Sequence, residues 1–141
     1  MNAKKIISLG YERRSVDELL EILCIHGVKK LLDVREVPIS RKKGFSKKSL
    51  TLSLMQVGIK YKHIKAAGNP HRKENDLGHG MQLYSSYLHK NPEVIEQVLD
   101  EISDSGVAVF CYERSHLDCH RSVLLDSLVK TNNHINIIRV E

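Results

Sequence analysis

The chain has 141 residues, of which 41% are hydrophobic and 28% charged, and its formal net charge at pH 7 is +5. This length fits one domain that buries a core without disulfides or metal ions. No apolar run approaches the roughly 18 residues of a membrane span, and the N-terminal residues lack the apolar core of a signal peptide. Three cysteines, an odd number, argue against a secreted disulfide framework, so we expect a cytoplasmic protein without a membrane partner.

Positive charge is concentrated in the first half of the chain. Residues 1–75 hold seventeen Lys and Arg against seven Asp and Glu, whereas residues 76–141 hold five against ten. Such an asymmetry suggests a basic face that contacts phosphates. The alternative is that these side chains only solvate helices and loops.

Strand and helix patterns alternate along the first half of the chain. Ser15 followed by Glu18 forms a capping box, which predicts a helix that Gly27 ends. Ser46 is expected to cap a second helix, which ends at Gly58. Cys24 lies beside the apolar stripe of the first helix and is assigned to the core. Strands are predicted at 5–9, 31–34 and 59–64, the last near a sheet edge.

The second half adds helices and two further strands. Residues 66–80 contain several Gly and polar residues, which predicts a long loop. Helices are predicted at about 81–89, 93–104 and 120–130, and strands at 107–112 and 135–140. This order predicts a single three-layer α/β domain over residues 1–141, with a mainly parallel sheet of about five strands and helices on both faces.

The segment from Cys111 to Arg121 joins the predicted fourth strand to the first turn of the last helix. A helix N-terminus attracts anions and lowers the pKa of thiols. Cys119 therefore has three possible roles: a nucleophile, with Arg121 holding an oxyanion and His116 or His120 moving protons; a metal ligand together with Cys111, His116 or His120; or a packing residue. The spacing is not that of the usual structural zinc motifs.

Polar side chains also follow the other predicted strands. Because the carboxyl ends of parallel strands share one edge of a sheet, where ligands bind in open α/β folds, these residues are expected to converge. Asp33 and Arg35 either face this site or form a structural ion pair. The basic loop at 41–43 either contacts phosphate or is simply solvated. The residues expected at this edge are Arg14, Arg35, Arg41, His63, Glu113, Cys119, His120 and Arg121.

Several motifs occur together in an order that resembles a known family. They are Gly10-Tyr11 through Arg14-Ser15, Asp33-Val34-Arg35 with Pro38 and Ser40-Arg41, Gly44-Phe45, Tyr61 with His63, Gly68-Asn69-Pro70, and Cys111-x-Glu113 followed by Cys119-His120-Arg121-Ser122. Together they resemble domain of unknown function 488. The resemblance implies a compact α/β domain but brings no established reaction or cofactor. It marks as signature residues Arg14, Asp33, Arg35, Arg41, His63, Gly68, Glu113, Cys119, His120 and Arg121.

The leading hypothesis is a protein that binds a phosphate-bearing ligand, a nucleotide or a nucleic acid, at the carboxyl ends of the strands. The expected ligand contacts are Arg14, Asp33, Arg35, Arg41, Lys43, Gly68 and Arg121, and the expected catalytic residues are Glu113, Cys119, His120 and His63. No cofactor and no metal ligand set are assigned, and the residues do not decide whether the protein is an enzyme. The alternatives are a cysteine-dependent enzyme of rhodanese or phosphatase type that uses Cys119, and a non-catalytic nucleic-acid-binding module.

Overall fold

The computed structural model describes residues 4–102 and 106–141. Its centre is a five-stranded parallel sheet with the strand order β3-β2-β4-β1-β5. The strands are β1 (Lys4–Gly10), β2 (Lys30–Asp33), β3 (Lys60–His63), β4 (Val107–Cys111) and β5 (Ile135–Val140). The predicted edge position of the third strand is confirmed. β4 lies in the centre and is buried along its whole length.

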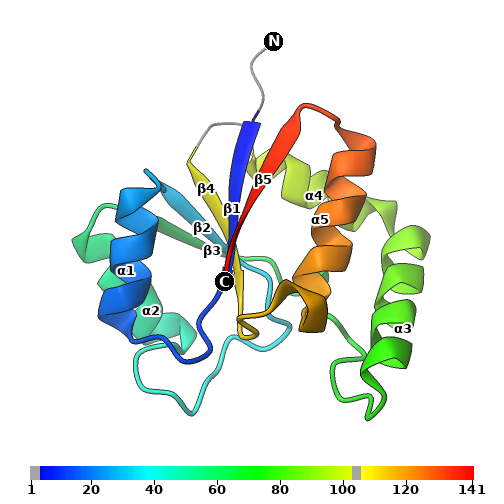
Figure 1. Ribbon diagram of the computed structural model, residues 1–141, viewed down its shortest axis with the longest axis horizontal. Coiled ribbons are helices and arrows are strands. Elements are labelled where there is room, and N and C mark those ends of the chain that lie inside the picture. Colours follow the sequence, from blue (N-terminus) through cyan, green and yellow to red (C-terminus); the bar gives the residue numbers. More distant parts are fainter. Residues whose placement is uncertain (1–3, 103–105) are drawn as a thin grey trace.

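Helices cover both faces of this sheet, as Figure 1 shows. α1 (Val16–Ile25) and α2 (Lys47–Gln56) lie on one face, and α3 (Leu77–Lys90), α4 (Pro92–Glu101) and α5 (His120–Thr131) lie on the other. Each face buries its own apolar cluster, one around Phe45 and Phe110 and the other around Tyr84 and Leu124. The predicted three-layer α/β fold is confirmed.

The long loop predicted at 66–80 is shorter than the sequence indicated. A 3₁₀ turn, η1 (Lys65–Ala67), follows β3 directly, and α3 begins at Leu77. α3 thus begins before the predicted helix start at about residue 81. The cause is local, since the side chain of Asp76 caps the helix by accepting a hydrogen bond from the backbone N–H of His79 at 3.1 Å. The helix predicted to end at residue 104 ends at Glu101 in α4, and its positions 103 and 104 lie outside the described residues.

Of the predictions about single residues of the first helices, one is confirmed, one holds in part and one is wrong. Ser15 and Glu18 form the reciprocal capping box. Ser46 is the N-cap residue of α2, as predicted, but its side chain makes no capping hydrogen bond. Its hydroxyl instead accepts from the N–H of Ser40 and donates to the carbonyl of the same residue. Cys24, assigned to the core, is exposed, because it lies just outside the buried stripe of α1.

In the described part of the chain, every helix is too short or too polar to cross a membrane.

Candidate functional site

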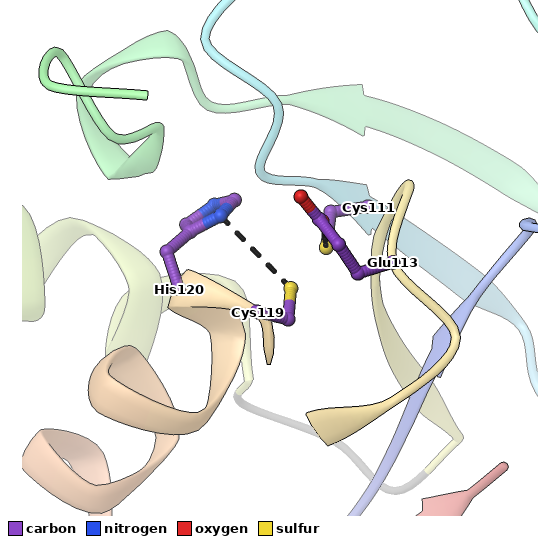
Figure 2. Close-up of side chains that lie close together, drawn as sticks. All are labelled: Cys111, Glu113, Cys119 and His120. Carbon is purple, nitrogen blue, oxygen red and sulfur yellow. Dashed lines mark hydrogen bonds between the residues drawn. The ribbon is translucent and has the colours of Figure 1, made fainter. Parts of the chain in front are cut away.

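Four side chains with metal-binding or acid–base chemistry meet beyond the carboxyl end of β4. They are Cys111, Glu113, Cys119 and His120, which we call the thiol cluster. One sulfur, nitrogen or oxygen atom from each lies within 4.8 Å of the corresponding atom of every other member. Figure 2 shows Cys111 leaving the end of the strand, while Cys119 and His120 begin α5. Residues separated by up to nine positions in the chain therefore form one compact site.

The turn that carries Glu113 is held against the end of β1. The backbone N–H of Tyr11 donates to the carbonyl of Cys111 at 3.1 Å, and that of Glu12 donates to the carbonyl of Tyr112 at 2.9 Å. Gly10 makes this approach possible, because a Cβ at that position would overlap the carbonyl of Glu113. The Gly10-Tyr11 motif therefore places one member of the thiol cluster.

The start of α5 places the next two members. Cys119 is the N-cap residue, and its sulfur accepts a hydrogen bond from the backbone N–H of Arg121 at 3.4 Å. The Nε2 atom of His120 donates to the carbonyl of Val34 at 2.9 Å, since a carbonyl can only accept. This bond turns Nδ1 of the same ring toward Cys119, 4.0 Å from its sulfur. When the imidazole is neutral, Nδ1 is therefore the basic nitrogen.

The side chain of Arg121 contacts the thiol cluster and is itself fully buried. Its guanidinium donates from Nη1 to the sulfur of Cys111 at 3.2 Å and from Nη2 to the backbone carbonyl of Glu113 at 2.9 Å. A buried cation beside two sulfur atoms favours their ionised form.

The electrostatics divide the two thiols into one acidic and one neutral group. Burial alone would raise the pKa of Cys119, but hydrogen bonds with Cys111 and His120 and the charge of Arg121 hold it well below its ordinary range. Burial raises the pKa of Cys111 well above its ordinary range, and the neighbouring Cys119 adds to the effect. Burial opposes protonation of His120, but contact with the Cys119 thiolate raises its pKa on balance.

Glu113 is the fourth titratable member of the cluster. Burial raises the pKa of its carboxyl group, and the negative charge of Cys119 raises it further. The thiol of Cys111 lies 3.5 Å from its Oε2 atom. Two sulfurs, an imidazole nitrogen and a carboxylate are also the donor types that Zn²⁺ prefers, and adjacent ligand atoms of tetrahedral zinc lie about 3.3–3.8 Å apart. The donor atoms of the cluster lie within 4.8 Å of one another, so they would have to close by up to about 1 Å around a zinc ion.

A cleft of about 300 Å³ borders the thiol cluster. Cys111, Glu113 and His120 contribute to its floor, and the rest of its lining is Tyr11, Arg35, Glu36, Val37, Ile39, Asn69, Arg72 and Tyr112. A smaller hollow of about 60 Å³ on the side of α3 also reaches Glu113 and His120. The cluster is thus buried but borders space that a small molecule can occupy.

Asp33 and Arg35 form a buried ion pair beside this cleft. The carboxylate accepts from Nε and Nη2 of Arg35 at 2.7–3.1 Å, and also from the Tyr61 hydroxyl at 2.5 Å. The remaining terminal nitrogen of Arg35 donates to the carbonyl of Phe45 at 2.7 Å and to the Tyr11 hydroxyl at 3.4 Å. The guanidinium is therefore bound mainly within the scaffold.

Three other residues that the sequence suggested for the site lie against the backbone of neighbouring segments. His63 donates from Nε2 to the carbonyl of Arg35 at 2.7 Å. Gly68 lies against the backbone of Glu36, where a Cβ would overlap it. Arg14 is buried and bonds the carbonyl of Gly10 at 3.0 Å.

Three further sequence candidates lie outside the cluster and the cleft. Arg41 and Lys43 are exposed and do not line the cleft. His116, an alternative metal ligand, instead bonds the hydroxyl of Ser8 at 2.8 Å.

Several residues that line the cleft were not predicted from the sequence as site residues. Tyr11, Asn69 and Arg72 all line it. The first two stood inside quoted motifs, and the Gly68-Asn69-Pro70 turn was the signal that pointed to the second. Arg72 has no signal of its own, because it lies in segment 66–80, whose glycines and polar residues predict only a loop.

The parallel sheet and the thiol cluster at its carboxyl edge define an α/β protein with a cysteine- and histidine-containing site. The family model of domain of unknown function DUF488 matches residues 15–128, and the chain belongs to this family. The resemblance seen in the motifs is thereby confirmed. No curated protein and no solved structure matched the chain.

Proposed function

We propose that this protein is zinc-dependent and that the thiol cluster holds the metal at the floor of the cleft. The observation that carries the proposal is the convergence of four zinc-type donor atoms within 4.8 Å of one another. In folded proteins such donors gather in a buried position mainly around metals or in catalytic centres. The cleft directly above them gives a small molecule access to the metal.

Burial favours a metal ligand over a free nucleophile as the role of Cys119. Its exposed fraction is 0%, so no substrate reaches the sulfur without a rearrangement of the surrounding chain. A metal ligand has no such requirement. Ionisation of Cys119 serves both roles, because the thiolate is the nucleophile and also the ligand.

The contacts behind the donor atoms support the same choice. Metal-binding histidines commonly donate their second ring N–H to a carbonyl, as His120 does to Val34. N–H groups of Arg121 reach both sulfurs, one from the backbone and one from the guanidinium. These bonds orient the donors before any metal arrives.

Zinc binding is tested with single cysteine and histidine variants. The wild-type protein should hold about one zinc ion per chain after exhaustive dialysis, measured by atomic absorption, with affinity measured by competition against a chromophoric chelator. Cys119→Ser, Cys111→Ser and His120→Ala should each weaken binding by more than about 100-fold, which exceeds the usual effect of outer-shell changes. Cys24→Ser is the matched control, because Cys24 is exposed and remote from the cluster.

Two results would overturn the zinc proposal. One is a folded wild-type protein that binds no zinc. The other is a serine variant of either cluster cysteine that binds zinc as tightly as Cys24→Ser does. Rapid alkylation of Cys119 at neutral pH in a metal-free wild type would instead support the cysteine-dependent enzyme.

A phosphate-bearing ligand remains a second candidate occupant of the cleft. It is favoured by Arg72, whose side chain is 44% exposed and lines both the cleft and the smaller hollow. Arg41 and Lys43 of the basic loop are exposed and would suit a longer nucleic acid. Thermal stabilisation by mononucleotides that is lost in Arg72→Ala would support a small phosphate-bearing ligand in the cleft. Binding of oligonucleotides alone, with an affinity that falls steeply as salt rises, would support a nucleic acid on the basic loop.

A further inference from the structure

We infer that Glu113 is a displaceable ligand and that the fourth metal position accepts an external ligand through an anionic oxygen. This inference rests on the proposed zinc function and specifies what its site binds. Catalytic zinc sites have three protein ligands and one exchangeable position, whereas structural sites are closed by four. Here Cys111, Cys119 and His120 would be the permanent ligands.

The protein supports the four donor side chains unequally. The imidazole of His120 is fixed by Val34, and each cysteine sulfur accepts an N–H from Arg121. By contrast, Arg121 bonds the backbone carbonyl of Glu113 and not its carboxylate. In the described residues no salt bridge reaches this carboxylate, and its side-chain partner is the thiol of Cys111.

Glu113 also differs from the two cysteines in its position relative to open space. Cys111 and Cys119 are almost completely buried, whereas Glu113 and His120 are partly exposed. Of these two, His120 is held in place by its bond to the carbonyl of Val34. Glu113 lines both the cleft and the smaller hollow beside it. In Figure 2 its carboxylate extends from the turn after β4 toward the other donors. It therefore lies where an incoming ligand would meet the metal, and it has space into which it can move.

The walls of the cleft indicate which ligand would replace the carboxylate. Arg35 and Arg72 both line the cleft, but the guanidinium of Arg35 is already bonded to Asp33 and Phe45. In the described part of the chain, Arg72 pairs with Glu36, and its side chain is 44% exposed. A metal cation and the nearby guanidinium of Arg72 favour an oxygen anion. A volume of about 300 Å³ suits a small molecule. The expected ligands are small carboxylates or hydroxamates, with Arg72 assisting at the rim.

Cobalt substitution tests this inference without knowledge of the natural ligand. Co²⁺ replaces zinc in the full chain, and its visible d–d absorption is followed while acetohydroxamate is added. A saturable spectral change is expected, with cobalt still bound after gel filtration. Arg72→Ala should weaken acetohydroxamate binding about threefold, as expected for an exposed charge. Arg139→Ala, an arginine on β5 outside the cleft, is the matched control.

The Glu113→Ala variant gives the decisive comparison. Its zinc affinity should fall by less than about tenfold, below the loss expected for Cys119→Ser, and acetohydroxamate should bind it more tightly than it binds the wild type. An equal loss of zinc affinity in Glu113→Ala and Cys119→Ser would overturn the inference. So would a wild-type cobalt spectrum that does not change when acetohydroxamate is added. Either result would indicate a closed site of four protein ligands. Failure of the zinc proposal differs from both, because the wild type would then bind no metal.

Discussion

Replacing Asp33 with asparagine should sharply reduce stability while leaving the thiol cluster able to bind zinc. The exposed fraction of Asp33 is 0% and that of Arg35 is 6%, and their charged groups meet through three hydrogen bonds of 2.7–3.1 Å. Asparagine keeps the volume but removes the charge, so the guanidinium stays buried without its counter-ion. This separates a scaffold role of Asp33 from a role in ligand binding.

The expected loss follows from the burial of the pair. Breaking a buried ion pair by removing one partner costs about 3–5 kcal/mol. Asparagine retains one acceptor oxygen for Arg35, so we expect about 3 kcal/mol, a large part of the 5–15 kcal/mol typical of a domain. The pKa of Tyr61, raised by burial and by the adjacent carboxylate, should also fall toward its ordinary value.

Urea unfolding followed by circular dichroism measures the loss. Glu36→Gln is the matched control, because Glu36 pairs with Arg72 at 3.0 Å at a more exposed position and should lose less than about 1 kcal/mol. If Asp33→Asn loses no more than this control, the ion pair does not stabilise the fold as reasoned. The double variant Asp33→Asn with Arg35→Met should regain part of the loss, since the unpaired charge is gone.

Two further predictions concern the surroundings of the cluster. Gly10→Ala should lower both thermal stability and zinc affinity, because the added Cβ displaces the turn of Glu113; Gly78→Ala, whose Cβ would find its nearest neighbour at 3.4 Å, should do neither. Burial lowers the pKa of His116 from 6.5, so the stability due to its neutral ring is present above that pH and lost as the pH falls below it. The free energy of unfolding, measured from about pH 7 to 5, should therefore decline more steeply in the wild type than in His116→Gln; parallel curves would contradict this.

The fold was predictable because its periodic signals agree with one another. Short apolar runs alternate with amphipathic segments, and βαβ connections dictate parallel strands. Helix boundaries were predictable where a side chain cap repeats a known pattern, as at Ser15. The start of α2 after Ser46 was also predicted correctly, although the hydroxyl of Ser46 bonds the backbone of Ser40 and not the first turn of the helix. The start of α3 was missed because Asp76 lies in a segment dominated by loop-forming residues.

The position of the site was easier to predict than the role of each residue. Topology alone brings Glu113, Cys119 and His120 to the carboxyl edge of the sheet. The sequence cannot say which way an arginine points, however, and both Arg35 and Arg121 proved to be buried among their own partners. Burial of a cation depends on contacts between distant segments, which no local pattern records.

The burial of Arg121 is itself an argument for the state of the cluster. A buried guanidinium is costly without an anionic partner. In the described part of the chain no carboxylate forms a salt bridge with Arg121, and its side-chain hydrogen bonds go to the sulfur of Cys111 and the carbonyl of Glu113. The anion that can balance it is therefore a thiolate of the cluster. Zinc would ionise both cysteines, including Cys111, whose own burial favours the neutral thiol. A metal-bound pair of thiolates would therefore balance the charge of the arginine that is buried at this point.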